Sequence, residues 1–288
     1  MNTHLLICTD LDRTLIPNGL LPESPAAREH FATLAAHSGV TLAYVSGRHR
    51  ALVEQAIEDY CLPCPDFVIA DVGTTIYHVG HENDWLRQDD WAQTLAADWG
   101  GRSHEQLAAL LADVEALRPQ EPERQNEHKL SYYTAPYGDR EILATRIHAR
   151  FAAPRILANL IWSVDEPAGV GLLDVLPASA SKFHAIEYLM RRQGFSAGEC
   201  VFCGDSGNDI EVLASPIPAV LVANCEPSVR ELALSLAADR GLREQLYIAR
   251  GGFHGMNGNY SAGALEGIAH FLPHTEGWMG FARVGSRT

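Results

Sequence analysis

Three polar clusters in the sequence each follow a short apolar segment. They are DLDRT at 10–14, SGR at 46–48 and GDSGND at 204–209. In an open parallel sheet, ligands bind beyond the carboxyl ends of the strands. If the apolar segments are strands of one sheet, we expect the side chains of the three clusters to share one crevice.

The carboxylates of that crevice need a counter-charge. They belong to Asp10, Asp12, Asp205 and Asp209. Four carboxylates in one place repel one another strongly unless a divalent cation neutralises them. Oxygen ligands, with no thiolate or imidazole among them, favour Mg²⁺. Lys182 lies near the start of a predicted helix, where exposed N–H groups favour an anion. A carboxylate–Mg²⁺ cluster facing a lysine and a hydroxyl is suited to phosphoryl transfer.

The elements that must position these clusters alternate along the chain. Apolar runs typical of strands covered on both faces occur at 5–9, 40–45, 67–70, 200–203 and 219–223. Helical segments separate them, and the first of these has Ser24 as N-cap, Pro25 at its first position and Gly39 as its stop. Strands that alternate with helices predict an α/β core with a doubly wound, Rossmann-like parallel sheet.

The middle of the chain has a different pattern. Ser103 and Gln106 have the spacing of a capping box, for a helix that runs to about Leu117. Further strands are predicted at 130–134, 156–164 and 171–176, and a further helix at 139–151. This mixture predicts an inserted α+β cap domain over residues 84–176. Residues 1–83 and 177–288 would then form a discontinuous catalytic core, whose last fifteen residues have no clear period and are expected to be a loose tail.

The composition excludes several classes of protein. Of the 288 residues, 47% are apolar and 20% are charged, which is the mix of a globular chain. The formal net charge is −14, whereas a nucleic-acid partner requires a basic face. No apolar run approaches the roughly 18 residues that would span a membrane. The N-terminus reaches Asp10 too early for a signal peptide, so we expect a cytoplasmic protein with no membrane or nucleic-acid partner.

Four of the six cysteines form two CxxC pairs, Cys61 with Cys64 and Cys200 with Cys203. A four-thiolate zinc site is one interpretation. Cys200 and Cys203 lie in a predicted strand, in which positions three apart point to opposite faces and cannot chelate one ion. Cys61 and Cys64 flank a Leu-Pro loop, where a labile disulfide stays open. Buried or incidental thiols are the favoured interpretation of both pairs.

DLDRTL, the isolated Ser46, Lys182 and GDSGND resemble, in this order, the four signature motifs of haloacid-dehalogenase-superfamily phosphatases. The insert between the second and third motifs is similar to that of the subgroup with a large α/β cap. Within this subgroup, the resemblance is closest to the sucrose-phosphate phosphatases. It is carried by LRPQEPERQNEHKLSYY at 117–133, CGDSGNDI at 203–210 and YSAGALEGIAHF at 260–271.

The resemblance implies a role for each carboxylate. Asp10 matches the nucleophile, which forms an aspartyl-phosphate. Asp12 matches the general acid/base, which protonates the leaving sugar oxygen and then activates water, and its backbone carbonyl matches a metal ligand. Asp205 matches a direct ligand of Mg²⁺, and Asp209 matches one that binds directly or through water. The implied cofactor is Mg²⁺, and its implied ligands are Asp10, Asp12, Asp205 and Asp209.

The resemblance also implies contacts to the phosphoryl group. Ser46 stands where the family more often has Thr and would hydrogen-bond a phosphoryl oxygen, with Gly47 beside it. Lys182 would offset the charge of the nucleophile and the phosphate. Asn208 would hold the phosphoryl group or the nucleophile. The implied catalytic residues are Asp10, Asp12, Ser46 and Lys182.

The predicted cap contains a polar cluster of Gln125, Asn126, His128 and Lys129. A solvated loop is the ordinary interpretation of such a cluster. Sugar hydroxyls need amide and ammonium partners in fixed positions, and the resemblance favours Gln125 and Lys129 as those partners. Arg48 is left outside the site, because an arginine there can pair with an acidic neighbour for structural reasons alone.

These residues together predict a Mg²⁺-dependent phosphatase of a sugar phosphate, with sucrose 6-phosphate preferred. Mannosylfructose phosphate and the phosphates of glucosyl- or mannosyl-glycerate stay open, because the cap sequence decides among them. Two interpretations of another class also stay open. One is a phospho-acceptor receiver module, although a receiver is shorter and lacks an insert. The other is a sugar-binding regulator of a partner glycosyltransferase, and the upstream glycosyltransferase is the candidate protein partner.

Overall fold

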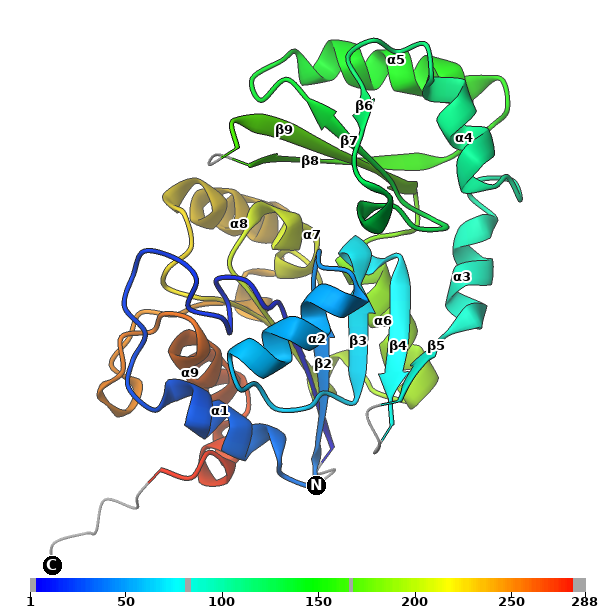
Figure 1. Cartoon of the computed structure of the whole chain (residues 1–288). Helices are drawn as coiled ribbons and strands as arrows, with labels where there is room; N and C mark the ends of the chain where they lie inside the picture. Colours follow the sequence, from blue (N-terminus) through cyan, green and yellow to red (C-terminus); the bar gives the residue numbers. More distant parts are fainter. Residues whose placement is uncertain (1–3, 81–83, 166–167, 282–288) are drawn as a thin grey trace, which may run out of the picture.

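A computed structural model describes residues 4–80, 84–165 and 168–281 of the chain. Its strands form two sheets, which lie one above the other in Figure 1. The larger sheet has the order β12-β11-β10-β1-β2-β3-β4-β5, and the smaller one has the order β6-β7-β9-β8. No helix of the described ranges has the length and apolar character that crossing a membrane requires.

The larger sheet contains the five predicted core strands and three others. Its strands are β1 (Leu5–Thr9), β2 (Val40–Val45), β3 (Phe67–Ala70), β4 (Thr75–Val79), β5 (Trp85–Arg87), β10 (Cys200–Gly204), β11 (Ala219–Leu221) and β12 (Leu246–Ile248). The pairs from β12 through β3 are parallel, which confirms the predicted α/β core. The sequence analysis missed β12 and the antiparallel strands β4 and β5 at the opposite edge.

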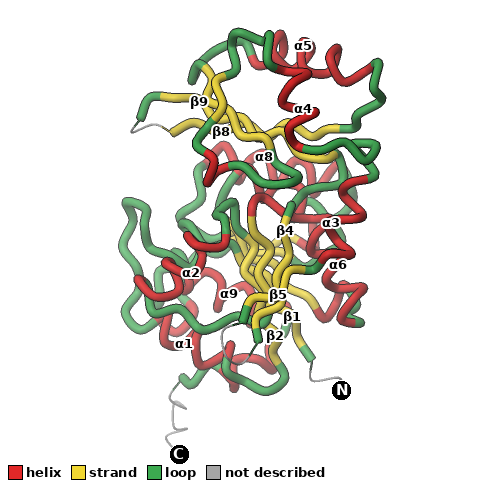
Figure 2. Tube along the Cα trace, turned by 45° about the vertical axis from the view of Figure 1, so that its right-hand side comes forward, coloured by secondary structure: helices red, strands yellow, loops and turns green. Residues whose placement is uncertain are grey.

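Helices cover both faces of this sheet (Figures 1 and 2). They are α1 (Ala27–Ala35), α2 (Arg50–Asp59), α3 (Asp89–Ala96), α6 (Lys182–Gln193), α7 (Ile210–Leu213), α8 (Pro227–Asp239) and α9 (Ser261–Phe271). Residues of α1, α2 and α9 pack on the face that carries Leu5 and Ile7. Residues of α3, α6, α7 and α8 pack on the face that carries Leu6 and Cys8. Alternate residues of one buried strand therefore supply two cores, as a doubly wound sheet requires.

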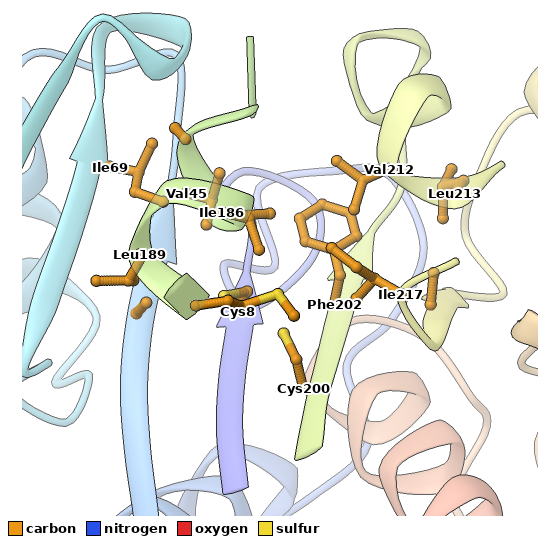
Figure 3. Close-up of a cluster of buried hydrophobic side chains, with 14 of the residues drawn as sticks. Cys8, Val45, Ile69, Ile186, Leu189, Cys200, Phe202, Val212, Leu213 and Ile217 are labelled. Carbon is orange, nitrogen blue, oxygen red and sulfur yellow. The ribbon is translucent and has the colours of Figure 1, made fainter. Parts of the chain in front are cut away.

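Figure 3 shows the second of these cores at the centre of the sheet. Ile186 and Leu189 of α6 lie over the strands that carry Val45 and Cys8. All six cysteines are free thiols, and Cys61 and Cys64 are exposed. Cys200 and Cys203 belong to cores on opposite faces, as predicted.

The smaller sheet is antiparallel and consists of β6 (Arg118–Pro119), β7 (Leu130–Thr134), β8 (Ala158–Asp165) and β9 (Val170–Pro177). Two helices, α4 (His104–Leu111) and α5 (Arg140–Ala152), pack on one of its faces around a separate core. In Figure 1 its other face is turned toward the larger sheet. Because β5 pairs within the larger sheet, the smaller sheet begins only at Arg118. The division of the chain at 84 and 176 stays a prediction.

Three local predictions were wrong. The capping box of Ser103 and Gln106 is present, but its helix ends at Leu111 and not at Leu117. Ser24 is not an N-cap: α1 follows Ala26, and Ser24 Oγ accepts a hydrogen bond from Asn257 N–H (2.9 Å). The expected loose tail contains a 3₁₀ helix at Pro273–Trp278, and its Trp278 ring stacks on His37. The end of that tail, 282–288, lies outside the described residues.

Candidate active site

The three polar clusters lie together at the carboxyl ends of β1, β2 and β10. The ladder of the sheet continues into the clusters, because Asp10 N–H donates to Cys203 O (2.9 Å) and Ser46 N–H donates to Ile69 O (2.8 Å). A cavity of about 260 Å³ opens beside them. Its lining includes Asp10, Asp12, Gly47, Asp205 and Asn208 from the predicted site and Arg124 and Lys129 from the insert.

Lys182 brings two of the clusters into contact. It is the first residue of α6, whose N-cap is Ser181, and its side chain is 1% exposed. Its Nζ donates to Asp10 Oδ2 (2.8 Å) and Asp209 Oδ1 (2.6 Å), and also to Asn208 Oδ1 (3.0 Å). Burial opposes the charge of Lys182, but the two carboxylates outweigh burial and raise its pKa above the ordinary value. The ammonium is therefore charged at neutral pH where it contacts Asp10 and Asp209.

One ammonium does not balance the carboxylates around it. Burial, opposed by Lys182 and reinforced by the charge of Asp209, raises the pKa of Asp10 to about 7. Burial and the charges of Asp209 and Asp10 raise the pKa of Asp205 to about 8. Two carboxyl pKa values that stay raised beside Lys182 and Arg13 indicate a site that needs more positive charge than these two residues supply.

Asp10, Asp205 and Asp209 fit a divalent cation. Each offers one carboxylate oxygen, and these oxygens lie within 4.8 Å of one another. Asp205 Oδ2 is buried and accepts no hydrogen bond from the described residues, although Arg13 Nε faces it at 3.3 Å. Both oxygens of Asp209 already accept hydrogen bonds, Oδ1 from Lys182 and Oδ2 from the N–H groups of Asp205 and Ser206. An all-oxygen set with one orphaned buried oxygen matches the ligand preference of Mg²⁺.

The Asp12 side chain lies outside that cluster and is held by donors. Arg48 Nε and Nη2 donate to its two oxygens (2.8 and 2.6 Å), and Asn18 Nδ2 donates to Oδ1 (2.7 Å). Burial opposes the charge of Asp12, but these hydrogen bonds and the Arg48 charge lower its pKa below the ordinary value. Arg48, which the sequence analysis left outside the site, is thus the ion-pair partner of the predicted acid/base.

Ser46 and Asn208 complete the core part of the site. Ser46 is buried at the end of β2, and its Oγ accepts a hydrogen bond from Arg48 N–H (3.2 Å). Asn208 Oδ1 accepts from Lys182 and from Ser206 Oγ (2.9 Å). Asn208 therefore lies on the turn that carries Asp205 and Asp209, and Ser46 lies on the turn that carries Arg48.

Lys129, directly before β7 of the smaller sheet, contacts a turn of the larger sheet. Its Nζ lies 3.2 Å from Asp71 Oδ1, and both side chains are buried. Asp71 N–H donates to Arg48 O (3.0 Å), and the next residue, Val72, donates to Ser46 O (3.1 Å). Lys129 therefore contacts the turn that fixes the backbone of the second polar cluster.

A second cavity, of about 520 Å³, lies between the smaller sheet and these turns. It shares Gly47, Arg124, Lys129, Ser206 and Asn208 with the first cavity, and Gln120, Trp162 and Asp174 also line it. Neither cavity is lined by Gln125, as far as the described residues show. The Gln125 amide instead donates to Gln120 O (3.1 Å) and Ser131 O (2.8 Å) and accepts from Ser131 N–H (2.8 Å). The structure thus brings Lys129 to the site but not Gln125.

Both lysines of the chain, Lys129 and Lys182, were named in the sequence analysis, and both are buried at this site. Lysine is almost never fully buried unless it is paired, and each of the two has a carboxylate partner here. The sequence analysis did not single out Arg124 or Asp71, and no motif or spacing marked them.

We expect the Lys129–Asp71 pair to stabilise the fold. Lys129→Met leaves the buried Asp71 carboxylate without its positively charged partner, which should lower the free energy of unfolding by about 3 kcal/mol. Adding Asp71→Asn removes the stranded charge, so the double variant should be less destabilised than the sum of the two single variants. Urea denaturation of the four proteins measures this coupling. Strictly additive losses would show that the two side chains do not interact.

Comparisons with known proteins agree with this geometry. The family model described as sucrose-6F-phosphate phosphohydrolase matches residues 3–272. A HAD-like hydrolase of Nitrosococcus oceani is 53% identical over 99% of this chain and 76% of its own. The mannosylfructose-phosphate phosphatase of Agrobacterium fabrum is 27% identical over 79% of this chain and 86% of its own. The chain spans about half the length of the plant sucrose-phosphatases it matches.

Among solved structures, the chain is similar to the sucrose-phosphatase of Synechocystis sp. PCC6803, determined in complex with sucrose and phosphate. The TM-score is 0.71 at 26% sequence identity, and the match covers 93% of this chain and 98% of that one. The likeness extends over both sheets, since the match leaves out only a small part of either chain.

Proposed function

Since the chain belongs to the sucrose-6F-phosphate phosphohydrolase family and is a phosphoric monoester hydrolase, we propose that it hydrolyses a disaccharide phosphate, with sucrose 6-phosphate as the preferred substrate. The observation that carries the proposal is the contact of Lys182 Nζ with Asp10 Oδ2 (2.8 Å) and Asp209 Oδ1 (2.6 Å). This contact supports a site in which a nucleophilic carboxylate, a fixed ammonium and a cation act together.

Asp10 acts as the nucleophile in the first step. One oxygen of its carboxylate forms a bond to phosphorus, and the bond from phosphorus to the sugar oxygen breaks. Lys182 offsets the negative charge of the incoming phosphate, and Ser46 donates its hydroxyl proton to a phosphoryl oxygen. The departing sugar oxygen takes its proton from Asp12, which yields the free sugar and an aspartyl-phosphate.

Asp12 acts as the base in the second step. It takes a proton from a water molecule, whose oxygen attacks phosphorus and displaces the Asp10 carboxylate as inorganic phosphate forms. Arg48 and Asn18 stabilise the carboxylate form of Asp12, which is the form that this step needs. To donate a proton in the first step, Asp12 must turn away from Arg48.

The cofactor of the proposal is Mg²⁺, which the carboxylates of Asp10 and Asp205 and the backbone carbonyl of Asp12 would hold, with Asp209 binding it directly or through water. When bound, it would neutralise part of the negative charge that the carboxylates and the phosphate bring together. The raised pKa values of Asp10 and Asp205 support this assignment, because a cation beside these groups keeps them ionised.

The insert, which we place at residues 84–176, recognises the sugar. The cavity beneath the smaller sheet shares Gly47 and Lys129 with the first cavity, in which the phosphate would bind. Lys129, Arg124 and Gln120 are its candidate partners for sugar hydroxyls. Gln125 does not itself face the sugar. It supports two residues that line this cavity, Gln120 and Ser131, through hydrogen bonds to their backbone oxygens.

Phosphate release from a panel of esters tests the proposal. Sucrose 6-phosphate should have the highest kcat/KM, above mannosylfructose phosphate, the phosphates of glucosyl- and mannosyl-glycerate, and simple alkyl phosphates. A higher value for another glycosyl phosphate would reassign the substrate within the class. A single turnover that stops at a stable phosphoprotein would indicate a receiver module, and no release from any ester would indicate a regulator.

We expect Asp12→Asn to affect poor leaving groups more than good ones. Without a proton from residue 12, an alkyl oxygen must leave as an alkoxide, so kcat/KM for an alkyl phosphate should fall by about 10²- to 10⁴-fold. A p-nitrophenolate needs little protonation, and its release should fall much less in the first step. Steady-state rates of both esters on the variant provide the measurement. Equal losses on the two esters would contradict the acid role.

Removal of divalent cations should lower activity by at least about a hundredfold. Added Mg²⁺ should restore it, whereas Ca²⁺ should be a poor substitute, because its larger and looser coordination sphere misplaces the carboxylates. The measurement is the rate in excess chelator, followed by titration with each ion. Full activity in excess chelator would refute the assignment of Asp10, Asp205 and Asp209 as a cation site.

A further inference from the structure

Arg13 lies in the first polar cluster, and the proposed steps do not use it. Its backbone is in the left-handed region (φ 57°), which is uncommon for a residue with a side chain. Two hydrogen bonds hold it there: Arg13 N–H donates to Asn18 Oδ1 (2.9 Å), and Arg13 O accepts from Asn224 Nδ2 (2.7 Å). An unfavourable conformation fixed from both sides points to a purpose for the side chain.

The guanidinium of Arg13 lies between two carboxylates of different burial. Its Nε is 3.3 Å from Asp205 Oδ2, and its Nη1 is 3.6 Å from Glu226 Oε1. The Asp205 side chain is 2% exposed, whereas that of Glu226 is 62% exposed. Arg13 itself is 39% exposed and lines the first cavity. It can therefore shift its contact outward from one carboxylate to the other without entering the core.

The oxygen that faces Arg13 is also the one best suited to a cation. Asp205 Oδ1 accepts a hydrogen bond from Thr14 Oγ1 (3.3 Å). Asp205 Oδ2 is buried and accepts none from the described residues, and Asp205 offers one carboxylate oxygen to the group that it forms with Asp10 and Asp209. A divalent cation held by Asp205 would have a positively charged guanidinium as its neighbour, and two such charges repel each other strongly in a site of low dielectric constant.

We propose that Arg13 sets the affinity of the site for its divalent cation: its guanidinium competes for Asp205, and Glu226 accepts the guanidinium when the cation binds. The inference rests on the proposed function for the identity of the cation. In this arrangement Arg13 weakens cation binding and keeps it reversible, and Glu226 limits the weakening. Neither residue is needed to hold the ion.

Calorimetric titration of the full chain with Mg²⁺ alone, without substrate, tests the inference. Arg13→Gln should lower the dissociation constant by about tenfold, because the repelling charge is lost. Glu226→Gln should raise it several-fold, because the displaced guanidinium has lost its acceptor. Arg191→Gln removes the same charge from an exposed position at the far end of α6 and should leave the constant unchanged.

The double variant separates a contact from a general charge effect. If Glu226 acts through Arg13, Glu226→Gln should have no effect in the Arg13→Gln background, whereas a long-range attraction for Mg²⁺ would persist there. Unchanged or weaker Mg²⁺ binding by Arg13→Gln would overturn the inference. If Arg13→Gln does not fold, Glu226→Gln tests the inference independently, because Glu226 is exposed. If the wild type binds Mg²⁺ tightly and no variant differs from it, the role of Arg13 is refuted and the cation site of the proposed function is not. Failure of every protein to bind Mg²⁺ would refute the cation site of the proposed function together with the inference.

Discussion

Asp10→Asn is expected to lower kcat for every phosphate ester by at least about ten-thousandfold. The substitution keeps the size of the side chain but removes the oxygen nucleophile, so no aspartyl-phosphate can form, and nucleophile losses in other enzymes are of this order or larger. A residual rate of that size corresponds to a barrier raised by about 5.4 kcal/mol. The measurement is single-turnover phosphate release with enzyme in excess, which reports the chemical steps without product release.

The same variant should remain folded, and its stability should depend less on pH. Burial raises the pKa of Asp10 to about 7 from an ordinary value near 4, so the folded state binds this proton more tightly than the unfolded state. The wild type should therefore lose stability as the pH rises from about 4 to about 7, and Asp10→Asn should lack this part of the loss. Unfolding in chelator at several pH values measures it.

A matched control for Asp10→Asn is Asp59→Asn on the surface of α2. The control should retain wild-type turnover and the wild-type dependence of stability on pH. Release of phosphate by Asp10→Asn within tenfold of the wild-type rate would contradict the assignment of the nucleophile. A variant that is inactive because it is unfolded would be recognised by its far-ultraviolet circular dichroism.

Lys182→Met is expected to damage both stability and catalysis. The ammonium donates to three acceptors, and its loss leaves the buried carboxylates of Asp10 and Asp209 facing each other without it. Breaking a buried ion pair from one side costs about 3–5 kcal/mol of stability. Loss of a fixed donor from the reacting phosphate should lower kcat by about 10²- to 10³-fold.

The two effects of Lys182→Met can be separated. Added Mg²⁺ supplies positive charge to the same carboxylates, so it should recover part of the stability but little of the activity, because the phosphate still lacks its ammonium. Urea denaturation with and without Mg²⁺, beside kcat at saturating Mg²⁺, gives both quantities. Near-wild-type stability of the variant in chelator would show that the Asp10–Lys182–Asp209 contacts do not stabilise the fold.

The core of the site was predictable because its geometry follows from regular structure. Asp10, Ser46 and Asp205 each follow a buried strand, and the carboxyl ends of adjacent parallel strands meet at one edge. The apolar runs therefore sufficed to place the three clusters together. Lys182 was singled out from its place near the start of a predicted helix, but its role came from the resemblance, because a single lysine does not show which strand ends its helix will approach.

The cap part of the site was harder to predict because it lies in irregular backbone. Gln125 and Lys129 are both polar residues that precede β7. The Gln125 amide bonds to the nearby backbone of Ser131, whereas the Lys129 ammonium pairs with Asp71 of the larger sheet's turn. Side-chain direction in such a loop depends on tertiary contacts, which periodicity does not encode. Asp71 was missed for the same reason, since its left-handed conformation (φ 53°) places it where an extended strand end would not.

Arg48 shows a different limit of sequence reasoning. The expectation that it pairs with an acidic neighbour is confirmed, but that neighbour is Asp12, so a contact that looks structural in the sequence lies inside the site. The type of a contact could be predicted from charge alone. The identity of the partner required the turn after β1 and the turn after β2 to be placed side by side.

Acid quenching of the wild-type protein, milliseconds after it is mixed with Mg²⁺ and sucrose 6-phosphate labelled with ³²P, tests the central claim most directly. We predict that free sucrose appears together with label bound covalently to the protein, in the peptide that contains Asp10, and that Asp10→Asn acquires none. The label should disappear at the rate at which inorganic phosphate is released. Release of labelled phosphate at the full rate without any labelled protein, or label in a peptide that lacks Asp10, would contradict the account.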